Sequence, residues 1–199
     1  RCQQVRRFTM TTDSTHALPV ADNVLAQTFA TRRPNQAWVT DITYVPTVEG
    51  WLYLAGVKDL YTCEVVGHAM DARMTTDLVS EALRKALTTK RPGPGLLHHS
   101  DRGSQYCAQD YQEQLRQFGL VPSMSRKGNC YDNAPMASFW GTLKNELVHH
   151  RRYATRAQAR HEIAEYIELF YNRQRRHSRL GNLSPVAFAQ QWARQQPAA

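Results

Sequence analysis

The sequence has no closely spaced cysteines, no long apolar run and no secretion signal at its start. Its four cysteines, Cys2, Cys63, Cys107 and Cys130, form no C-x-x-C pair, which argues against a disulfide framework and against a zinc ribbon. No apolar stretch approaches the roughly 18 residues of a membrane-spanning helix. We therefore expect a cytoplasmic protein without a membrane partner. Because the chain starts at Arg1, we also expect it to be part of a longer protein.

Acidic residues are in the minority. The 199 residues include 17 Asp and Glu against 25 Lys and Arg, which gives a formal net charge of +8. An excess of positive charge favours a polyanionic partner such as nucleic acid, although charge alone leaves a merely basic protein as an equal alternative. Hydrophobic residues make up 42% of the chain, enough to form the core of one domain with an appendage.

Strand and helix patterns alternate from residue 37 onward, after a polar segment with only a short helical pattern at residues 24–29. Three segments rich in β-branched and aromatic residues predict an antiparallel meander. The expected strands are residues 37–47, 51–59, 61–71, 96–101 and 120–125. The expected helices are residues 77–87 with a cap at Thr76 or Asp77, residues 104–119, the second half of residues 131–147, a helix from a Thr155 cap through Phe170, and a last helix that starts at Ser184 and Pro185. This order predicts an α/β fold in which helices cover a mixed five-stranded sheet.

Two aspartates stand at unusual places in these patterns. Asp41 lies in the middle of the first strand, where aspartate is rare, and Asp101 ends the fourth strand. Taken singly, Asp41 could face solvent and Asp101 could cap a turn or a helix, which are the commoner roles. The strand order makes the first and fourth strands plausible neighbours, so both carboxylates could converge on one point. Such oxygen clusters bind hard divalent cations, and two ions roughly 4 Å apart can clamp an in-line phosphoryl transfer.

Several motifs that follow one another along the chain resemble a single family. They are WVTDITY, HHSDRGSQY, SRKGNCYDNAPM, SFWGTLKNEL and YIELFYNRQRRHSRLGNLSP. Over residues 12–188 they are similar to IS3-type insertion-sequence transposases, which belong to the retroviral-integrase superfamily and have an RNase H-like fold. The resemblance implies an active site of two aspartates and a glutamate, here Asp41, Asp101 and the residue that follows Asp101 after a gap of 35 residues. That residue is Ala137, and Ser138 after it matches the family again, so one residue is exchanged and the register is intact.

Neither nearby carboxylate is expected to replace the missing glutamate. Glu146 lies nine positions after Ala137, about 900° around the helix and therefore on its opposite face. Asp132 precedes the helix in a loop and would reach only partway. We expect Ala137 to be a deliberate inactivating substitution, with a naturally inactive relative as the alternative. The fold should tolerate it, because alanine is the best helix former.

The resemblance implies cleavage of transposon-end DNA and transfer of its 3′-hydroxyl to a new strand. It implies two Mg²⁺ (or Mn²⁺) ions per intact active site, with Asp41 and Asp101 as metal ligands. The implied partners are double-stranded DNA (terminal inverted repeats and target DNA) and further copies of the chain, as a homodimer or higher oligomer on DNA in the bacterial cytoplasm at the nucleoid. Residues 1–33 would be a linker after an upstream helix-turn-helix segment, residues 34–153 the integrase-type catalytic core, and residues 154–199 a helical C-terminal extension.

Two other functions remain open at this point. One is a DNA-binding module that keeps the RNase H-like fold without chemistry, which with Ala137 could be the literal behaviour of this chain. The other is an RNase H-like nuclease that acts on RNA–DNA hybrids.

Basic and amide side chains near the expected site are candidates for DNA contact. Lys144 lies seven positions after Ala137, two turns along the same face and roughly 10 Å away, although a solvated lysine is the simpler reading without the family. The loop before this helix carries residues that could contact DNA or order the site: Arg126, Lys127, Asn129 and Asn133. A basic tract is expected to contact phosphates, with a solvated helix end as the alternative: Arg173, Arg175, Arg176 and Arg179.

Two adjacent histidines, His98 and His99, have the residue type of zinc ligands. Strand alternation predicts that only one of them lies on the inner face of the sheet. We expect that one to support the packing behind the site, and we expect no zinc.

Overall fold

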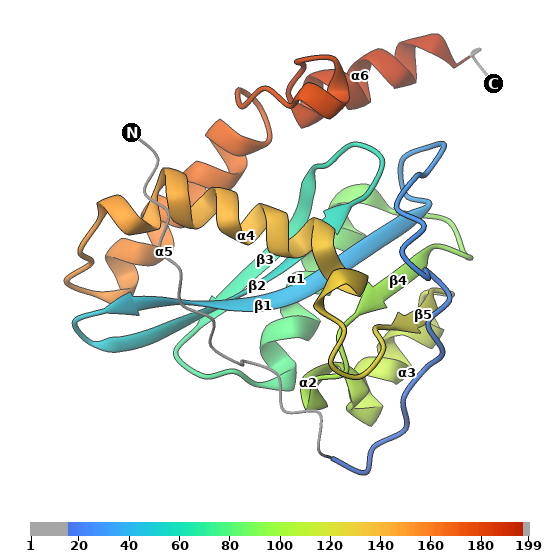
Figure 1. Ribbon diagram of the computed structural model, residues 1–199, viewed down its shortest axis with the longest axis horizontal. Helices are drawn as coiled ribbons and strands as arrows, with labels where there is room; N and C mark the ends of the chain where they lie inside the picture. The colour runs from blue at the N-terminus through green and yellow to red at the C-terminus, as the bar shows by residue number, and fades with distance from the viewer. Residues whose placement is uncertain (1–15, 197–199) are drawn as a thin grey trace.

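A mixed five-stranded sheet forms the centre of the computed structural model, which describes residues 16–196 (Figure 1). The strand order is β3-β2-β1-β4-β5, which confirms the predicted mixed five-stranded sheet with the first and fourth strands as neighbours. Strands β1, β2 and β3 pair antiparallel, whereas β4 runs parallel to both β1 and β5. The strands are β1 Ala37–Thr47, β2 Gly50–Asp59, β3 Val65–Asp71, β4 Leu97–Ser100 and β5 Val121–Met124. The expectations about Cys2 and about residues before 16 lie outside the described part of the chain.

Helices cover both faces of the sheet (Figure 1). Helices α4 and α5 lie on one face, and α1, α2 and α3 lie on the other. The helices are α1 Thr76–Lys90, α2 Ser104–Cys107, α3 Gln109–Gln117, α4 Ala134–Glu146, α5 Arg156–Glu165 and α6 Pro185–Gln195. Each face has its own apolar core, so neighbouring β1 residues such as Trp38 and Val39 are both buried but in different cores. No helix within residues 16–196 combines the length and the apolar character that a membrane crossing needs.

Four local predictions are wrong. The short helical pattern at residues 24–29 forms a turn, with positive φ at Ala26 and Gln27. The helix expected at residues 104–119 is interrupted at Ala108, whose ψ of 139° is extended. The third strand starts later than expected, because the carboxylate of Asp59 accepts the amides of the following turn. The N-cap of α1 is Thr75, without a side-chain hydrogen bond, and not Thr76 or Asp77.

The C-terminal segment continues from α5 into a π-helical turn, Tyr166–Tyr171, and then into α6. Thr155 caps α5 as predicted, since its side chain accepts from the amide of Gln158. Ser184 caps α6 in the same way, with Pro185 in the first turn. Directly after the π-helical turn, the side chain of Asn172 pairs with the outer edge of β3: its Oδ1 accepts from Val65 N at 3.0 Å, and its Nδ2 donates to Val65 O at 2.9 Å.

Candidate active site

The parallel pairing of β1 with β4 brings Asp41 and Asp101 to the same level. Val39 pairs with His99, and the same register continued by two residues places the two aspartates opposite each other. Both side chains line one small pocket of about 10 Å³. The remaining lining residues are Ile42, Met74, Gly103, Gln105 and Tyr106. The amide of Gly103 donates to Asp101 Oδ1 at 2.8 Å, which orients that carboxylate at the end of its strand.

The two carboxylates repel each other. Burial and, after it, the charge of Asp101 together raise the pKa of Asp41 from 3.8 to about 7. The amide of Ile42, the Trp140 indole N–H at 3.1 Å from Oδ2, and the charge of Lys144 all oppose this rise. A divalent cation bound between the carboxylates would relieve the repulsion.

The donor set fits a hard divalent cation. Asp41 and Asp101 supply carboxylate oxygens, the ligands that Mg²⁺ and Mn²⁺ prefer. Within residues 16–196 no group of three or more His, Cys, Asp or Glu side chains could hold a metal ion. Asp41 and Asp101 are therefore the residues here that would hold a divalent ion.

Helix α4 is fixed to β1 and β2 on both sides of Ala137. Before Ala137, Asn133 Nδ2 donates to Thr40 O at 2.9 Å, and the buried Lys58 donates to Pro135 O at 3.1 Å. After it, Trp140 donates to the carboxylate of Asp41. Residue 137 is exposed and lies between these anchors. The first turns of α4 are thus held against the strand that carries Asp41.

A glycine allows this close approach. Gly56 pairs with Asp41 across β1 and β2, and a Cβ built on it would lie 2.8 Å from the indole of Trp140. The roles of Gly56, Trp140 and Lys58 were not predicted from the sequence. A glycine inside a strand pattern is a signal of close approach by another segment, so Gly56 could have been found. The roles of Trp140 and Lys58 depend on how α4 docks.

Neither alternative carboxylate reaches the pocket. Asp132 is 0% exposed and is held by Arg126, whose Nη2 donates to Oδ1 at 2.9 Å, and by the side-chain amides of Asn23 and Gln27. Glu146 is occupied at the other end of α4, where it binds Arg175. Both carboxylates therefore have structural partners elsewhere.

Replacing Asp132 with Asn should lower the free energy of unfolding by about 2 to 3 kcal/mol, because it removes the buried anion to which Arg126, Asn23 and Gln27 donate. The hydrogen bonds from Arg126 hold the pKa of Asp132 well below its usual range. Its stabilisation is therefore present above about pH 4 and is lost as the pH falls further. Urea unfolding of Asp132→Asn at pH 7 tests this, with Asp110→Asn, at an exposed position of α3, as the control. Equal small losses in both variants would contradict the role of Asp132.

The loop residues before α4 are mainly engaged in local structure. Asn133 is 8% exposed and bonded to β1, so its burial argues against direct DNA contact and in favour of ordering the site. Arg126 pairs with Asp132, and Asn129 accepts from the amide of Tyr131. Lys127 is exposed.

Lys144 is a basic residue whose charge acts on the carboxylate of Asp41. Its Nζ lies 4.9 Å from the ring centroid of Tyr44 on β1, a cation–π contact. Burial lowers the pKa of Lys144, while the charge of Asp41 raises it. Lys144 and Asp41 therefore influence each other directly across α4 and β1.

The C-terminal basic tract is not part of this site. Arg175 pairs with Glu146 at 2.7 Å, so its charge is neutralised by α4. Arg179 donates to the carbonyl of Phe29 and remains exposed, as do Arg173 and Arg176. The structure separates the tract into one structural arginine and three surface arginines.

Both histidines of β4 are buried, and the expectation that only one faces inward is wrong because helices cover both faces of the sheet. His98 contacts the hydroxyl of Tyr111 at 3.1 Å, and His99 contacts Ser123 Oγ at 2.9 Å. Burial lowers their pKa values to about 3 and about 4, so both are neutral. They hold β4 in place behind the carboxylate pair.

Comparisons with known proteins define the class. Models of the integrase core domain match residues 31–130 and 137–192. The catalytic core domain of HTLV-2 integrase in complex with magnesium superimposes with a TM-score of 0.62 at 14% identity, covering 80% of this chain and 99% of that one. A chain of a simian T-cell lymphotropic virus intasome gives a TM-score of 0.66 at 16% identity, over 92% of this chain and 60% of that one. The fold is therefore that of an RNase H-like integrase core.

Sequence relatives narrow the class to a family. The insertion element IS600 uncharacterized 31 kDa protein of Shigella sonnei is 64% identical over 192 residues, which are 96% of this chain and 71% of that protein. Transposase InsF for insertion sequence IS3A of Escherichia coli (strain K12) is 46% identical over 188 residues, 94% of this chain and 65% of that protein. The chain belongs to the integrase-core family of IS3-type insertion-sequence transposases. It spans about two thirds of the length of its InsF relative.

Proposed function

We propose that this chain is the catalytic part of a transposase that cleaves transposon-end DNA and joins the freed 3′-end to another strand, and that Ala137 makes it inactive. In the joining step the 3′-hydroxyl attacks phosphorus of the other strand, whose 3′-oxygen leaves. The observation that carries the proposal is the pair of mutually repelling carboxylates, Asp41 and Asp101, in one pocket, with residue 137 of α4 held beside β1. Membership of the transposase family supplies the reaction class. The pocket of Asp41 and Asp101 supports this part of the fold as the reaction site.

Asp41 and Asp101 would hold divalent ions, which supply charge stabilisation for an in-line phosphoryl transfer when bound. The chain's own groups orient these ligands: Trp140 donates to Asp41, and the Gly103 amide donates to Asp101. Lys144 offers a cation to the phosphate backbone close to the pair. No protein nucleophile is required, because water and then a DNA 3′-hydroxyl attack phosphorus. A full set of two ions needs a carboxylate at position 137.

We further propose double-stranded DNA as the partner, both terminal inverted repeats and target, and a dimer or higher oligomer as the working form at the bacterial nucleoid. The net charge of +8 supports a polyanionic partner. The HTLV-2 core is described in dimeric and trimeric forms with magnesium, and the simian viral relative as an intasome, which support assembly and metal dependence here.

The three possible functions differ in their products. The Ala137→Glu form is incubated with labelled transposon ends and, separately, with an RNA–DNA hybrid, each with Mg²⁺. Joined DNA ends support the transposase. Hydrolysis of the hybrid without joining would favour a nuclease, and binding without any product would favour a DNA-binding module.

Lys144→Gln should weaken DNA binding about equally for all sequences and lower the slope of log Kd against log salt by about one unit, as expected for one lost phosphate contact. Binding is measured by fluorescence anisotropy over a salt series. Lys85→Gln is the matched control, because Lys85 is an exposed lysine of α1 on the opposite face of the sheet. A slope unchanged by Lys144→Gln, or changed equally by both substitutions, would make Lys144 an ordinary surface lysine.

A further inference from the structure

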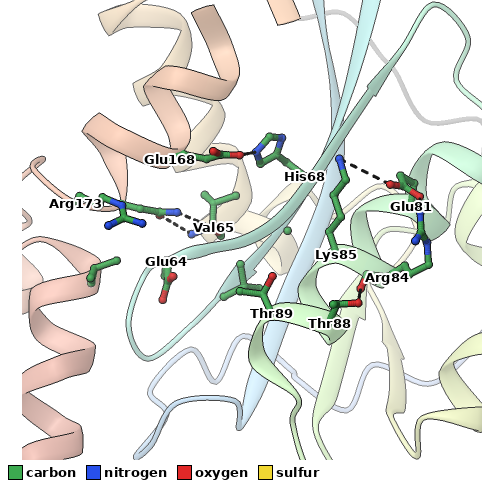
Figure 2. A pocket seen from close by; sticks show the side chains of 14 residues that line it. Glu64, Val65, His68, Glu81, Arg84, Lys85, Thr88, Thr89, Glu168 and Arg173 are labelled. Atoms are coloured by element: carbon green, nitrogen blue, oxygen red, sulfur yellow. Dashed lines mark hydrogen bonds and ion pairs between the residues drawn. The ribbon is translucent and has the colours of Figure 1, made fainter. Parts of the chain in front are cut away.

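Two open pockets away from the carboxylate pair differ sharply in charge. The first, of about 460 Å³, lies between β3, α1 and the C-terminal segment (Figure 2). Its charges are mutually compensated: Glu168 contacts His68, and Lys85 faces Glu81. Its lining therefore has no marked excess of either charge.

The second pocket, of about 450 Å³, has an unbalanced lining. It is formed by two arginines, two glutamines and a tryptophan: Arg32, Arg33, Gln36, Trp192 and Gln196. None of these described lining residues is acidic. We call it the arginine–tryptophan pocket. Its volume falls in the range of about 300–1,000 Å³ that is typical of small-ligand sites.

The indole of Trp192 is held in place from behind. Tyr61, in the turn after β2, meets Trp192 edge-on with ring centroids 6.3 Å apart. Tyr61 also packs against Phe188, one turn earlier on α6, at 5.3 Å. This bracing orients the half-buried indole towards the pocket before any ligand arrives, which lowers the entropic cost of binding.

The two arginines stand on a short turn in front of β1. The backbone amide of Arg32 donates to Gln36 Oε1 at 2.8 Å, which closes the turn and fixes the backbone that carries Arg32 and Arg33. Both arginine side chains are exposed at the rim. Two cations next to a flat aromatic ring form a site for a ligand that combines an anionic group with a planar ring.

We infer that the arginine–tryptophan pocket binds an unpaired nucleotide of a DNA strand, with its base stacked on Trp192 and its phosphates at Arg32 and Arg33. Stacking on an aromatic side chain requires an exposed base face, which a paired base inside a duplex does not offer. The glutamine amides can donate to and accept from a base edge. The choice of DNA as the polyanion rests on the proposed function. Gln36, at the edge of the pocket, lies roughly 17 Å along β1 from Asp41, at about 3.3 Å per residue. A single DNA strand can span this distance and contact both the pocket and the carboxylate pair.

The test compares a labelled single-stranded oligonucleotide with a blunt duplex of the same sequence. Trp192→Ala should weaken single-strand binding about tenfold and duplex binding less than about twofold, since one base–aromatic stack is lost. Trp192→Phe should retain most of the affinity, because it keeps a ring to stack on. Thermal unfolding of each variant checks that it is folded.

Arg33→Ala provides a second, exposed variant that does not disturb the packing of α6. It should weaken single-strand binding at least about threefold, whereas Arg194→Ala should have less than about a twofold effect. Arg194 is the matched control, because it is an arginine on α6, the helix that carries Trp192, but it does not line the pocket. Equal losses from Arg33→Ala and Arg194→Ala would show general electrostatic attraction and overturn the inference.

Single-strand binding that is insensitive to Trp192→Ala would also overturn it. So would a copolymer of Glu and Tyr that binds in a Trp192-dependent way while the oligonucleotide does not, because the ligand would then be a protein. Failure of the proposed function has a different signature, namely no joined ends from the Ala137→Glu form. The two outcomes are therefore distinguishable.

Discussion

Ala137→Glu should raise the rate of Mg²⁺- or Mn²⁺-dependent end joining by about a thousandfold or more over the present chain. Removal of a metal-ligand carboxylate costs several kcal/mol of transition-state stabilisation, and each 1.36 kcal/mol is about tenfold in rate. The first turns of α4 are already held against β1 through Thr40 and Asp41, so a glutamate at position 137 needs no rearrangement of the helix. DNA affinity should change little, because the basic side chains are unaltered.

The assay uses a supercoiled plasmid with both transposon ends and a protein extended to the length of the InsF relative, of which this chain covers 65%. Ser138→Glu is the matched control, since it places the same carboxylate on the next, equally exposed position of α4 but about 100° around the helix. Comparable joining by the unaltered Ala137 chain, or equal gains from both substitutions, would mean that position 137 does not hold the third carboxylate.

Asp41→Asn should have opposite effects on activity and on stability. In the Ala137→Glu form it should reduce joining to background, because a metal ligand is lost. In the metal-free protein it should raise the free energy of unfolding at pH 8 by about 1 to 3 kcal/mol, because it removes a half-buried charge that Asp101 repels. Trp140 can still donate to the amide oxygen of Asn at this position, so the docking of α4 is preserved.

The stability gain from Asp41→Asn should depend on pH in a defined direction. Because the pKa of Asp41 is raised from 3.8 to about 7 in the folded protein, its unfavourable contribution is absent below about pH 4, grows as the pH rises and is constant above about pH 7. Unfolding in EDTA across this range measures it, with Asp110→Asn as the control. Added Mg²⁺ should raise the Tm of the unaltered chain but not that of Asp41→Asn. A stability loss in the metal-free variant would contradict the repulsion between the two aspartates.

The pattern of residue types along the sequence was sufficient to predict the central sheet. β-Branched and aromatic residues in alternation marked β1 and β2, and the strand order that followed placed Asp41 near Asp101, as the register of β1 with β4 bears out. The segment at residues 24–29 shows why local patterns failed elsewhere. The amide of Leu25 donates to Ser123 Oγ, and the carbonyl of Asp22 accepts from Met124 N, so docking on β5 overrides the helical tendency.

The surroundings of the site were less predictable than its carboxylates. Asn133 belonged to a polar loop and carried no signal that it would be buried against Thr40. Lys58 fits the pattern of an ordinary strand residue, and Trp140 fits that of an ordinary helix residue. Their roles arise from the docking of α4 on β1, which no local periodicity encodes.

The pairing of Asn172 with Val65 limits where the chain can be cut to give a stable fragment. β3 is an edge strand, and the exposed backbone groups of an edge invite pairing with another chain. The Asn172 side chain imitates a neighbouring strand at this point, and Ile163, Ile167 and Tyr171 fill the same apolar core as β1 and β2. A fragment that stopped at residue 153 would thus keep the carboxylates but lose the cover on the edge of β3 and part of its apolar core. The shortest soluble core that can be excised from this chain must run past Asn172.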